Sequence, residues 1–168
     1  MNETSLLIQT FLMHNSVPFT RYCHPAWAER NQWKTSLKKL NVLSIPVKSI
    51  LACDRSGDNL LMGVFPELDA DETSLLRAIP SALPLTSPQE QEILSSLRCE
   101  KRLLSPLSLI FRMEGSMILY MPENLELCEY LSFPCADATE TVVLSRFDFL
   151  GIFAPAAGIS VMHVQSCS

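Results

Sequence analysis

Lys48 is the residue whose surroundings in the sequence point most directly to chemistry. It places a charge inside the apolar run 47–53, where a half-buried strand position does not accept an ammonium group without a partner. Such a lysine either reaches solvent along its aliphatic stem or directs its amine into a site. In a site, the ammonium group could hold a carbonyl oxygen or a phosphate.

Three other polar side chains stand beside prolines. His24 precedes Pro25, and its imidazole could contact a substrate amine or ribose, or serve only the fold. Ser105 and Ser108 belong to the run Ser-Pro-Leu-Ser, where Pro106 favours a turn. Their hydroxyls could hydrogen-bond an acyl carbonyl or satisfy the turn's own backbone. Both interpretations stay open for each residue.

The basic side chains are concentrated in two windows of an otherwise acidic chain of net charge −5. Residues 21–48 hold six basic side chains against one acid, and residues 98–112 hold four against one. If the windows meet in space they form one positive face, which is what phosphate binding requires. Alternatively they are two solvated faces. The side chains that we predict to bind tRNA are Lys34, Lys38, Lys39, Lys101 and Arg102.

The elements that position these residues follow from apolar periodicity and turn signals. The strongest signal is a β-hairpin, in which the runs 47–53 and 60–65 flank the turn sequence Asp54–Asp58. We expect helices over 4–14, 26–40, 69–79, 87–97 with Ser87 as cap, and 147–153 after Ser145, and strands over 117–121, 130–133 and 141–144. This order predicts an α+β or mixed α/β fold.

Length and composition set the class of protein. The 168 residues fit one domain, which we place at 1–153, followed by a loosely packed tail over 154–168. Nearly half of the residues are apolar, which excludes a disordered chain. The six cysteines are scattered without a Cys-x-x-Cys pair, and we interpret them as reduced thiols.

The sequence also lacks the features of several other classes. No signal peptide or membrane-spanning run is evident, so we expect a cytoplasmic protein that does not engage a membrane. The sequence carries no Gly-x-Ser-x-Gly elbow, phosphate loop, dinucleotide fingerprint or His-Glu-x-x-His motif. A serine hydrolase, an NTPase, a dehydrogenase and a zinc protease are therefore not supported.

A series of short motifs, in order and at fitting intervals, resembles the YbaK/prolyl-tRNA-synthetase-associated editing family. Pro46–Ile50 is similar to the family's lysine-bearing strand, where Val-Lys-Ser/Thr is usual. The other matching segments are Val17–Phe19, Tyr22–Pro25, Pro66–Asp69, Cys99–Ser108 and Phe133–Phe149. Together they cover roughly residues 4–153.

The resemblance implies a curved mixed β-sheet, a partial barrel with flanking helices, and a pocket beside the lysine strand. The activity it implies is hydrolysis of the aminoacyl ester of mischarged tRNA, a step of translation fidelity, without cofactor or metal. In this sequence it makes Lys48 catalytic and makes His24, Ser49, Ser105, Pro106 and Ser108 substrate-binding residues. The implied partners are mischarged aminoacyl-tRNA and, further, an aminoacyl-tRNA synthetase.

Four positions depart from the family's pattern. The two glycines of its substrate loop fall near Arg102 and at Ser108, an acidic residue is matched by Pro122, and a glycine after the Phe-Pro pair is matched by Ala136. Losing glycine reshapes a backbone that approaches a ligand closely. These departures favour a rival hypothesis, in which the chain is a catalytically degenerate member that binds tRNA or protein. The presence of Lys48 favours the hypothesis that the chain is an active enzyme.

Overall fold

The computed structural model describes residues 2–112 and 117–165, and their strands form two four-stranded sheets. One sheet has the order β1–β7–β6–β2, made of Thr20–Cys23, Glu140–Ser145, Tyr130–Pro134 and Ile45–Pro46. The other has the order β3–β4–β5–β8, made of Lys48–Cys53, Leu60–Phe65, Met117–Pro122 and Ile159–Val164. Each sheet mixes parallel with antiparallel pairs. The expected mixed α/β fold is confirmed, with no closed barrel among the described strands.

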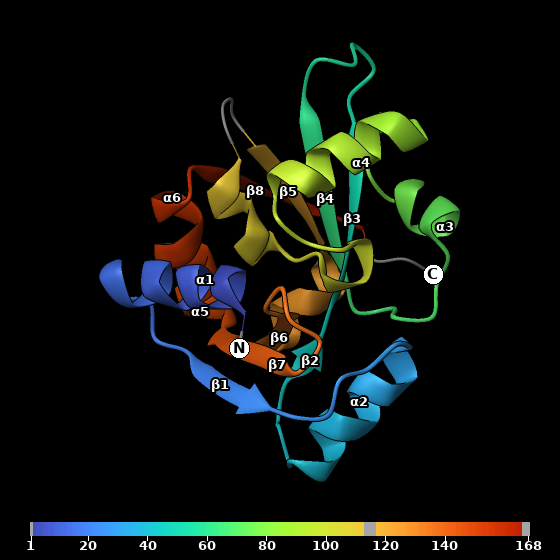
Figure 1. The fold of residues 1–168 in the computed structure, drawn as a ribbon. Coiled ribbons are helices and arrows are strands. Elements are labelled where there is room, and N and C mark those ends of the chain that lie inside the picture. Colours follow the sequence, from blue (N-terminus) through green and yellow to red (C-terminus); the bar gives the residue numbers. More distant parts are fainter. Residues whose placement is uncertain (1, 113–116, 166–168) are drawn as a thin grey trace.

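The helices lie around the two sheets (Figure 1). The α-helices are α1 Glu3–His14, α2 Arg30–Lys39, α3 Glu72–Leu76, α4 Ser87–Ser96, α5 Arg146–Asp148 and α6 Ala154–Ala156. The 3₁₀ segments are η1 Lys101–Leu103, η2 Pro106–Phe111 and η3 Glu123–Leu127, and η4 Phe149–Phe153 is a π-helical stretch between α5 and α6. Helix α2 lies apart from the others in Figure 1, at the lower end of the molecule. Within the described residues, no helix is both long enough and apolar enough to cross a membrane.

The predicted hairpin is confirmed as β3 and β4, which pair antiparallel from Lys48 opposite Phe65 to Cys53 opposite Leu60. Its turn is held by Asp54. Hydrogen bonds from Ser56 and Asn59 lower the pKa of that carboxyl group to about 2. Gly57 adopts a φ of +76°, a conformation that costs glycine little and other residues more.

Helix boundaries differ from the predicted ones where local capping decides them. Helix α4 is capped by Thr86 rather than Ser87, because Thr86 Oγ1 accepts from the Gln89 amide at 3.3 Å and Gln89 Oε1 accepts from the Thr86 amide at 2.9 Å. Helix α2 begins at Arg30 instead of 26, after a loop whose last amides donate to Gln32 Oε1. Helix α3 is limited to Glu72–Leu76 behind its cap Asp71.

The prediction of a loosely packed tail from residue 154 onward was wrong for the described part of that segment. Ala154–Ala156 is helical, and Ile159–Val164 forms β8, which pairs in parallel with all of β5. Ile159 and Val164 are each only 7% exposed. Parallel pairing leaves no turn signal near the strand, so the local sequence did not reveal it. Cys167 lies outside the described residues.

Candidate functional site

Lys48 stands where the chain passes from one sheet to the other. Strand β2 ends at Pro46, the Val47 amide still donates to Ser132 of β6 at 3.2 Å, and Lys48 begins β3 in the second sheet. Its side chain is half-buried, and its ammonium group donates to the carbonyl oxygen of Ala70 at 2.8 Å. The predicted placement of this lysine on a strand is therefore confirmed.

Beside Lys48 lies a pocket of about 360 Å³ with a largely polar lining. Four separate parts of the chain contribute to it: the loop before α2 with the start of that helix, the first residue of β3, the loop after β4, and η1. The lining residues are Trp27, Ala28, Glu29, Arg30, Asn31, Lys48, Leu68, Asp69 and Arg102. We call this the Lys48 pocket.

The surroundings of Lys48 disfavour its charged form. Burial is the main cause that lowers the pKa of its amine, and the positive charge of Arg30 lowers it further. Glu72 partly opposes the shift by its negative charge. A lysine with a lowered pKa in a concave polar site is typical of functional positions.

Arg30 and Arg102 both lie over the ring of one tryptophan, Trp27. Their guanidinium carbons lie 5.9 Å and 5.6 Å from the Trp27 ring centroid. Arg102 also donates to the Trp27 carbonyl at 2.9 Å, and Arg30 Nη2 donates to the Arg102 carbonyl at 3.4 Å. Behind Trp27, the Trp33 ring stacks at a centroid distance of 5.5 Å. The two basic windows of the sequence therefore meet at this pocket.

His24 is not among the residues that line the Lys48 pocket. It is 9% exposed, its Nδ1 lies 3.1 Å from the Pro25 carbonyl and its Nε2 lies 2.7 Å from Thr141 Oγ1. Because a carbonyl only accepts, Nδ1 carries the proton, and a neutral ring then accepts from Thr141 at Nε2. The same hydroxyl oxygen accepts from Trp33 Nε1 at 2.9 Å. The His24 ring thus links Thr141 of β7 to the loop that carries Trp27.

Ser105 and Ser108, which were predicted to bind substrate, are buried and do not line the Lys48 pocket. Ser105 is fully buried, and its Oγ accepts from the Leu107 amide at 3.2 Å, which caps η2. Pro106 and Ser108 are buried with it. Leu104, Leu107 and Leu109 draw this segment into the core, so it does not line the Lys48 pocket as a substrate loop would.

Ser49 is buried on the face of β3 that points away from the Lys48 pocket. Its hydroxyl lines a very small hollow together with Leu104 and has no hydrogen bond among the described residues. The side chains of Lys48 and Ser49 point to opposite sides because successive residues of a strand do so. The structure therefore does not bring Ser49 to the pocket of its neighbour.

Lys101 is engaged in ion pairs. Its ammonium group lies 2.9 Å from Glu72 and 3.0 Å from Glu90. Burial disfavours its charge, but these two carboxylates outweigh burial and raise the pKa of Lys101. Its predicted role in phosphate binding would require these acids to be displaced.

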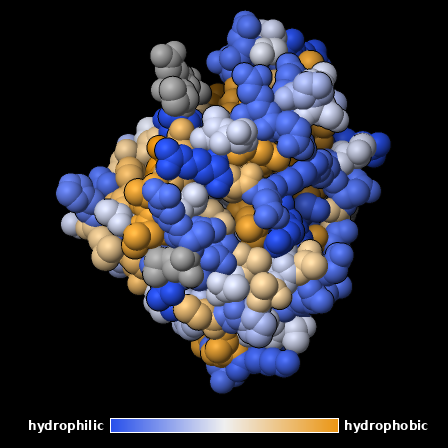
Figure 2. All heavy atoms as spheres, viewed as in Figure 1, coloured by the Kyte–Doolittle hydropathy of each residue, from blue (hydrophilic) through white to orange (hydrophobic). Residues whose placement is uncertain are grey.

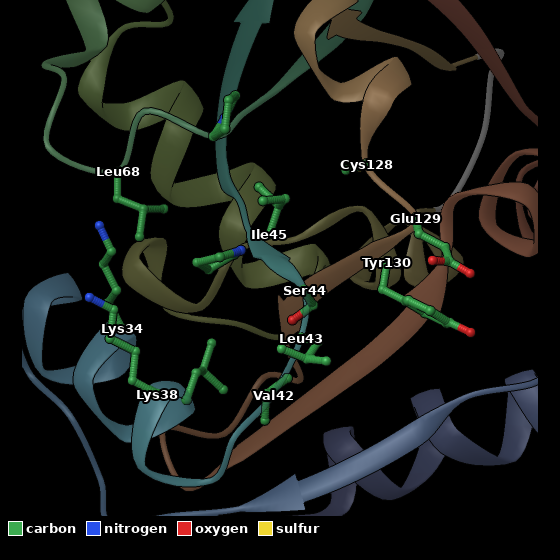
Figure 3. Close-up of a pocket in the computed structure, with 13 residues that line it drawn as sticks. Lys34, Lys38, Val42, Leu43, Ser44, Ile45, Leu68, Cys128, Glu129 and Tyr130 are labelled. Atoms are coloured by element: carbon green, nitrogen blue, oxygen red, sulfur yellow. The ribbon is translucent and has the colours of Figure 1, made fainter.

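The three lysines of α2 are exposed and lie along two hollows. Lys34 and Lys38 flank a mostly apolar pocket of about 710 Å³, which has Leu68 in common with the Lys48 pocket. Figure 3 shows both lysines on the α2 side of this apolar pocket and Tyr130 on the other side. Lys39 lines a separate hollow of about 430 Å³ that reaches Trp27.

The departures from the family's pattern have a structural counterpart at Ala136. This residue has a φ of +58°, in the left-handed region that glycine occupies readily and alanine does not. Its carbonyl accepts from the Asn2 side chain at 2.8 Å. The backbone at Ala136 thus has a conformation that glycine adopts more readily than alanine.

Sequence reasoning missed Trp27 and Arg30 as residues of the pocket. Arg30 was counted in a basic window, and Trp27 follows the His24–Pro25 pair. Because Trp27 lies in the loop before α2, no helical spacing indicates its contacts with Arg30 and Trp33, which are tertiary. Among the described residues, no cluster of histidine, cysteine or carboxylate side chains could hold a metal ion.

Comparison with known proteins supports the fold. No protein-family model matches the sequence, and no curated protein is similar to it. The structure is similar to that of a candidate trans-editing enzyme for prolyl-tRNA synthetase, with a TM-score of 0.65, 12% identity, and 99% of each chain covered. It is also similar to a hypothetical protein, with a TM-score of 0.63, 12% identity, and 94% of this chain and 97% of the other covered. A scaffold from a computational epitope-grafting study matches with a TM-score of 0.63, 11% identity and 99% of each chain.

Proposed function

We propose that the protein hydrolyses the ester bond that joins an amino acid to the 3′ end of tRNA, and that the reaction takes place in the Lys48 pocket. The observation that carries this proposal is a half-buried, desolvated lysine in a concave site, on a fold similar to that of a candidate trans-editing enzyme. The motifs around Lys48 in the sequence support the same activity.

Hydrolysis of an ester requires the protein mainly to position a water molecule and to stabilise the negative charge of the oxyanion. Water attacks the acyl carbon, the carbonyl oxygen becomes an oxyanion, and the ester bond breaks so that the ribose hydroxyl leaves with a proton from water. A cation placed at the oxyanion lowers this barrier. Lys48 has three N–H donors, of which one is used by Ala70, so its ammonium group retains donors for a carbonyl oxygen.

The test of this function is a deacylation assay with purified protein and a panel of mischarged tRNAs, with the protein in excess. Release of the amino acid faster than spontaneous hydrolysis, and for some pairs only, supports the proposal. A rate equal to the spontaneous one for every aminoacyl-tRNA contradicts it.

A second candidate function is a protein-binding module, and the apolar pocket beside α2 favours it. Leu43 is 90% exposed and lines that pocket, while Leu127, next to its lining residue Cys128, is 93% exposed. Figure 2 shows hydrophobic and hydrophilic side chains side by side at the lower end of the molecule, where α2 ends. Exposed apolar surface of this kind is typical of contact sites.

This alternative predicts a stable complex with a purified aminoacyl-tRNA synthetase, such as prolyl-tRNA synthetase, in sedimentation velocity. Leu43→Asp would abolish the complex without altering the fold, since that side chain is almost fully exposed. Hydrolysis by a parent protein that forms no such complex would count against the module.

A further inference from the structure

Three cationic side chains from distant parts of the chain line the Lys48 pocket. They are Arg30, Lys48 and Arg102. Two acids, Glu29 and Asp69, also line it, but both are exposed. Because like charges repel more strongly where water is reduced, such a cluster needs negative charge close by.

The described residues do not supply a direct counterion to two of these cations. Arg102 has Glu100 at 3.3 Å, but neither Arg30 nor Lys48 has a carboxylate within 4 Å among the residues that the structure describes. Lys101 shows the contrast, since two carboxylates pair with it in the same region. Burial lowers the pKa values of both Arg30 and Lys48, and the negative charge of Glu72 opposes this lowering only in part.

Arg30 also holds a donor that lacks an acceptor. Its Nη1 atom is closed off from solvent and makes no hydrogen bond to any described residue, and the same holds for Trp27 Nε1. A buried donor without a partner costs free energy, and the cost is larger on a charged group. Arg30 itself lines the pocket, so its guanidinium group borders the space that a ligand would occupy.

The position of Arg30 is fixed by aromatic packing. Its guanidinium group lies over Trp27, which Trp33 supports from behind and Arg102 holds through its backbone carbonyl. A planar guanidinium group held in place binds carboxylate or phosphate through two parallel hydrogen bonds at little entropic cost.

We propose that Arg30 and Lys48 together form a binding site for an oxyanion of the substrate, in which the Arg30 guanidinium group and the Lys48 ammonium group both donate to its two charged oxygens. The identity of the ligand as part of an aminoacyl-tRNA rests on the proposed function. Two parts of that substrate have this chemistry: the phosphate of the terminal nucleotide, and a carboxylate on the side chain of the attached amino acid.

Tryptophan fluorescence provides a direct test, because the sequence has two tryptophans, of which Trp27 lies under Arg30 and Trp33 stacks on Trp27. The probes are inorganic phosphate and adenosine 5′-monophosphate for the phosphate arm, with adenosine as the neutral control. Glutamate α-methyl ester serves the carboxylate arm, with glutamine methyl ester as its neutral control. Saturable binding of only one charged series identifies which part of the substrate occupies the site.

Arg30→Gln should weaken binding of the charged probe by at least about tenfold, as expected for loss of a charge-assisted bidentate contact. Arg30→Lys should fall between the parent and Arg30→Gln. Arg55→Gln is the matched control, because Arg55 is exposed in the β3–β4 turn, and it should bind as the parent does. Melting temperatures and circular dichroism verify that the variants fold.

The inference is overturned if the parent binds neither charged series at millimolar concentration, or if folded Arg30→Gln binds as tightly as the parent. Deacylation kinetics distinguish failure of the oxyanion site from failure of the proposed hydrolysis. A parent that hydrolyses aminoacyl-tRNA, with an unchanged KM in Arg30→Gln, refutes the oxyanion site alone. A parent that binds adenosine 5′-monophosphate through Arg30 without hydrolysis refutes the reaction and supports the site.

Discussion

Replacing Lys48 by alanine separates the two roles that this lysine can have. If the ammonium group stabilises the oxyanion, we expect single-turnover hydrolysis of a mischarged tRNA to slow by about 100-fold or more, comparable to the loss of one oxyanion-hole donor. If the lysine only covers apolar surface with its stem, hydrolysis should continue at nearly the parent's rate.

The structure predicts a small effect of the same change on stability. The variant loses the hydrogen bond from Lys48 to the Ala70 carbonyl, worth roughly 1 kcal/mol for a half-exposed donor. It also loses the repulsion between Lys48 and Arg30, which offsets that cost. Because about 1 kcal/mol shifts the melting temperature of a chain of this size by roughly 2 to 4 °C, we expect a change within that range.

The pH dependence of stability and of activity tests the role of Lys48 independently. The folded-state pKa of Lys48 is lowered, so the unfolded chain holds this proton more tightly than the folded chain. The contribution of Lys48 to stability therefore grows as the pH rises from the lowered value toward the ordinary lysine pKa, whereas an activity that needs the ammonium form declines. The free energy of unfolding of Lys48→Ala should therefore lack this increase with pH.

Melting temperature and hydrolysis are measured on the same preparations, with Arg55→Ala as an exposed control. The reasoning is refuted if folded Lys48→Ala hydrolyses mischarged tRNA at the parent's rate. It is also refuted if the loss of activity follows a large loss of stability, because the lysine would then be structural.

Four further predictions concern other parts of the molecule. Glu140→Ala should cost about 2 to 3 kcal/mol in a urea titration, because this 1%-exposed carboxylate pairs with the β1 arginine and accepts from a buried serine. Gly63→Ala should cost about 1 to 3 kcal/mol in the same assay, since the added carbon would lie 2.5 Å from a phenylalanine ring. Burial raises the pKa of Cys135 to about 11, so this thiol should resist iodoacetamide at pH 8 until the protein unfolds, as mass spectrometry can show. Binding of tRNA should weaken with salt, and reversing Lys38 and Lys39 to glutamate should weaken it in a filter-binding assay.

Elements defined by neighbouring residues could be predicted from the sequence. The turn that Asp54 closes is local, and so are the apolar runs that form β3 and β4. Lys48 was predictable for the same reason, because a charge within an apolar strand is visible without knowledge of the fold.

Features that depend on distant contacts could not be predicted. Strand β8 is stabilised by parallel pairing with β5, about 40 residues earlier in the sequence, and its own pattern is irregular. The contact between Arg30 and Arg102 joins residues 72 positions apart. Ser105 belongs to a Ser-Pro sequence that is typical of a surface turn, yet it is buried because the leucines on either side pack into the core. In each case the tertiary packing overrides what the local residues favour.

The most direct test of the proposed reaction is to carry out hydrolysis in H₂¹⁸O and to analyse the released amino acid by mass spectrometry. Attack of water on the acyl carbon predicts one ¹⁸O in the carboxylate of the amino acid and none in the 3′-terminal ribose, at a rate that falls at least about 100-fold in Lys48→Ala. Release at the spontaneous rate, with no difference between the parent and Lys48→Ala, would contradict the proposed function.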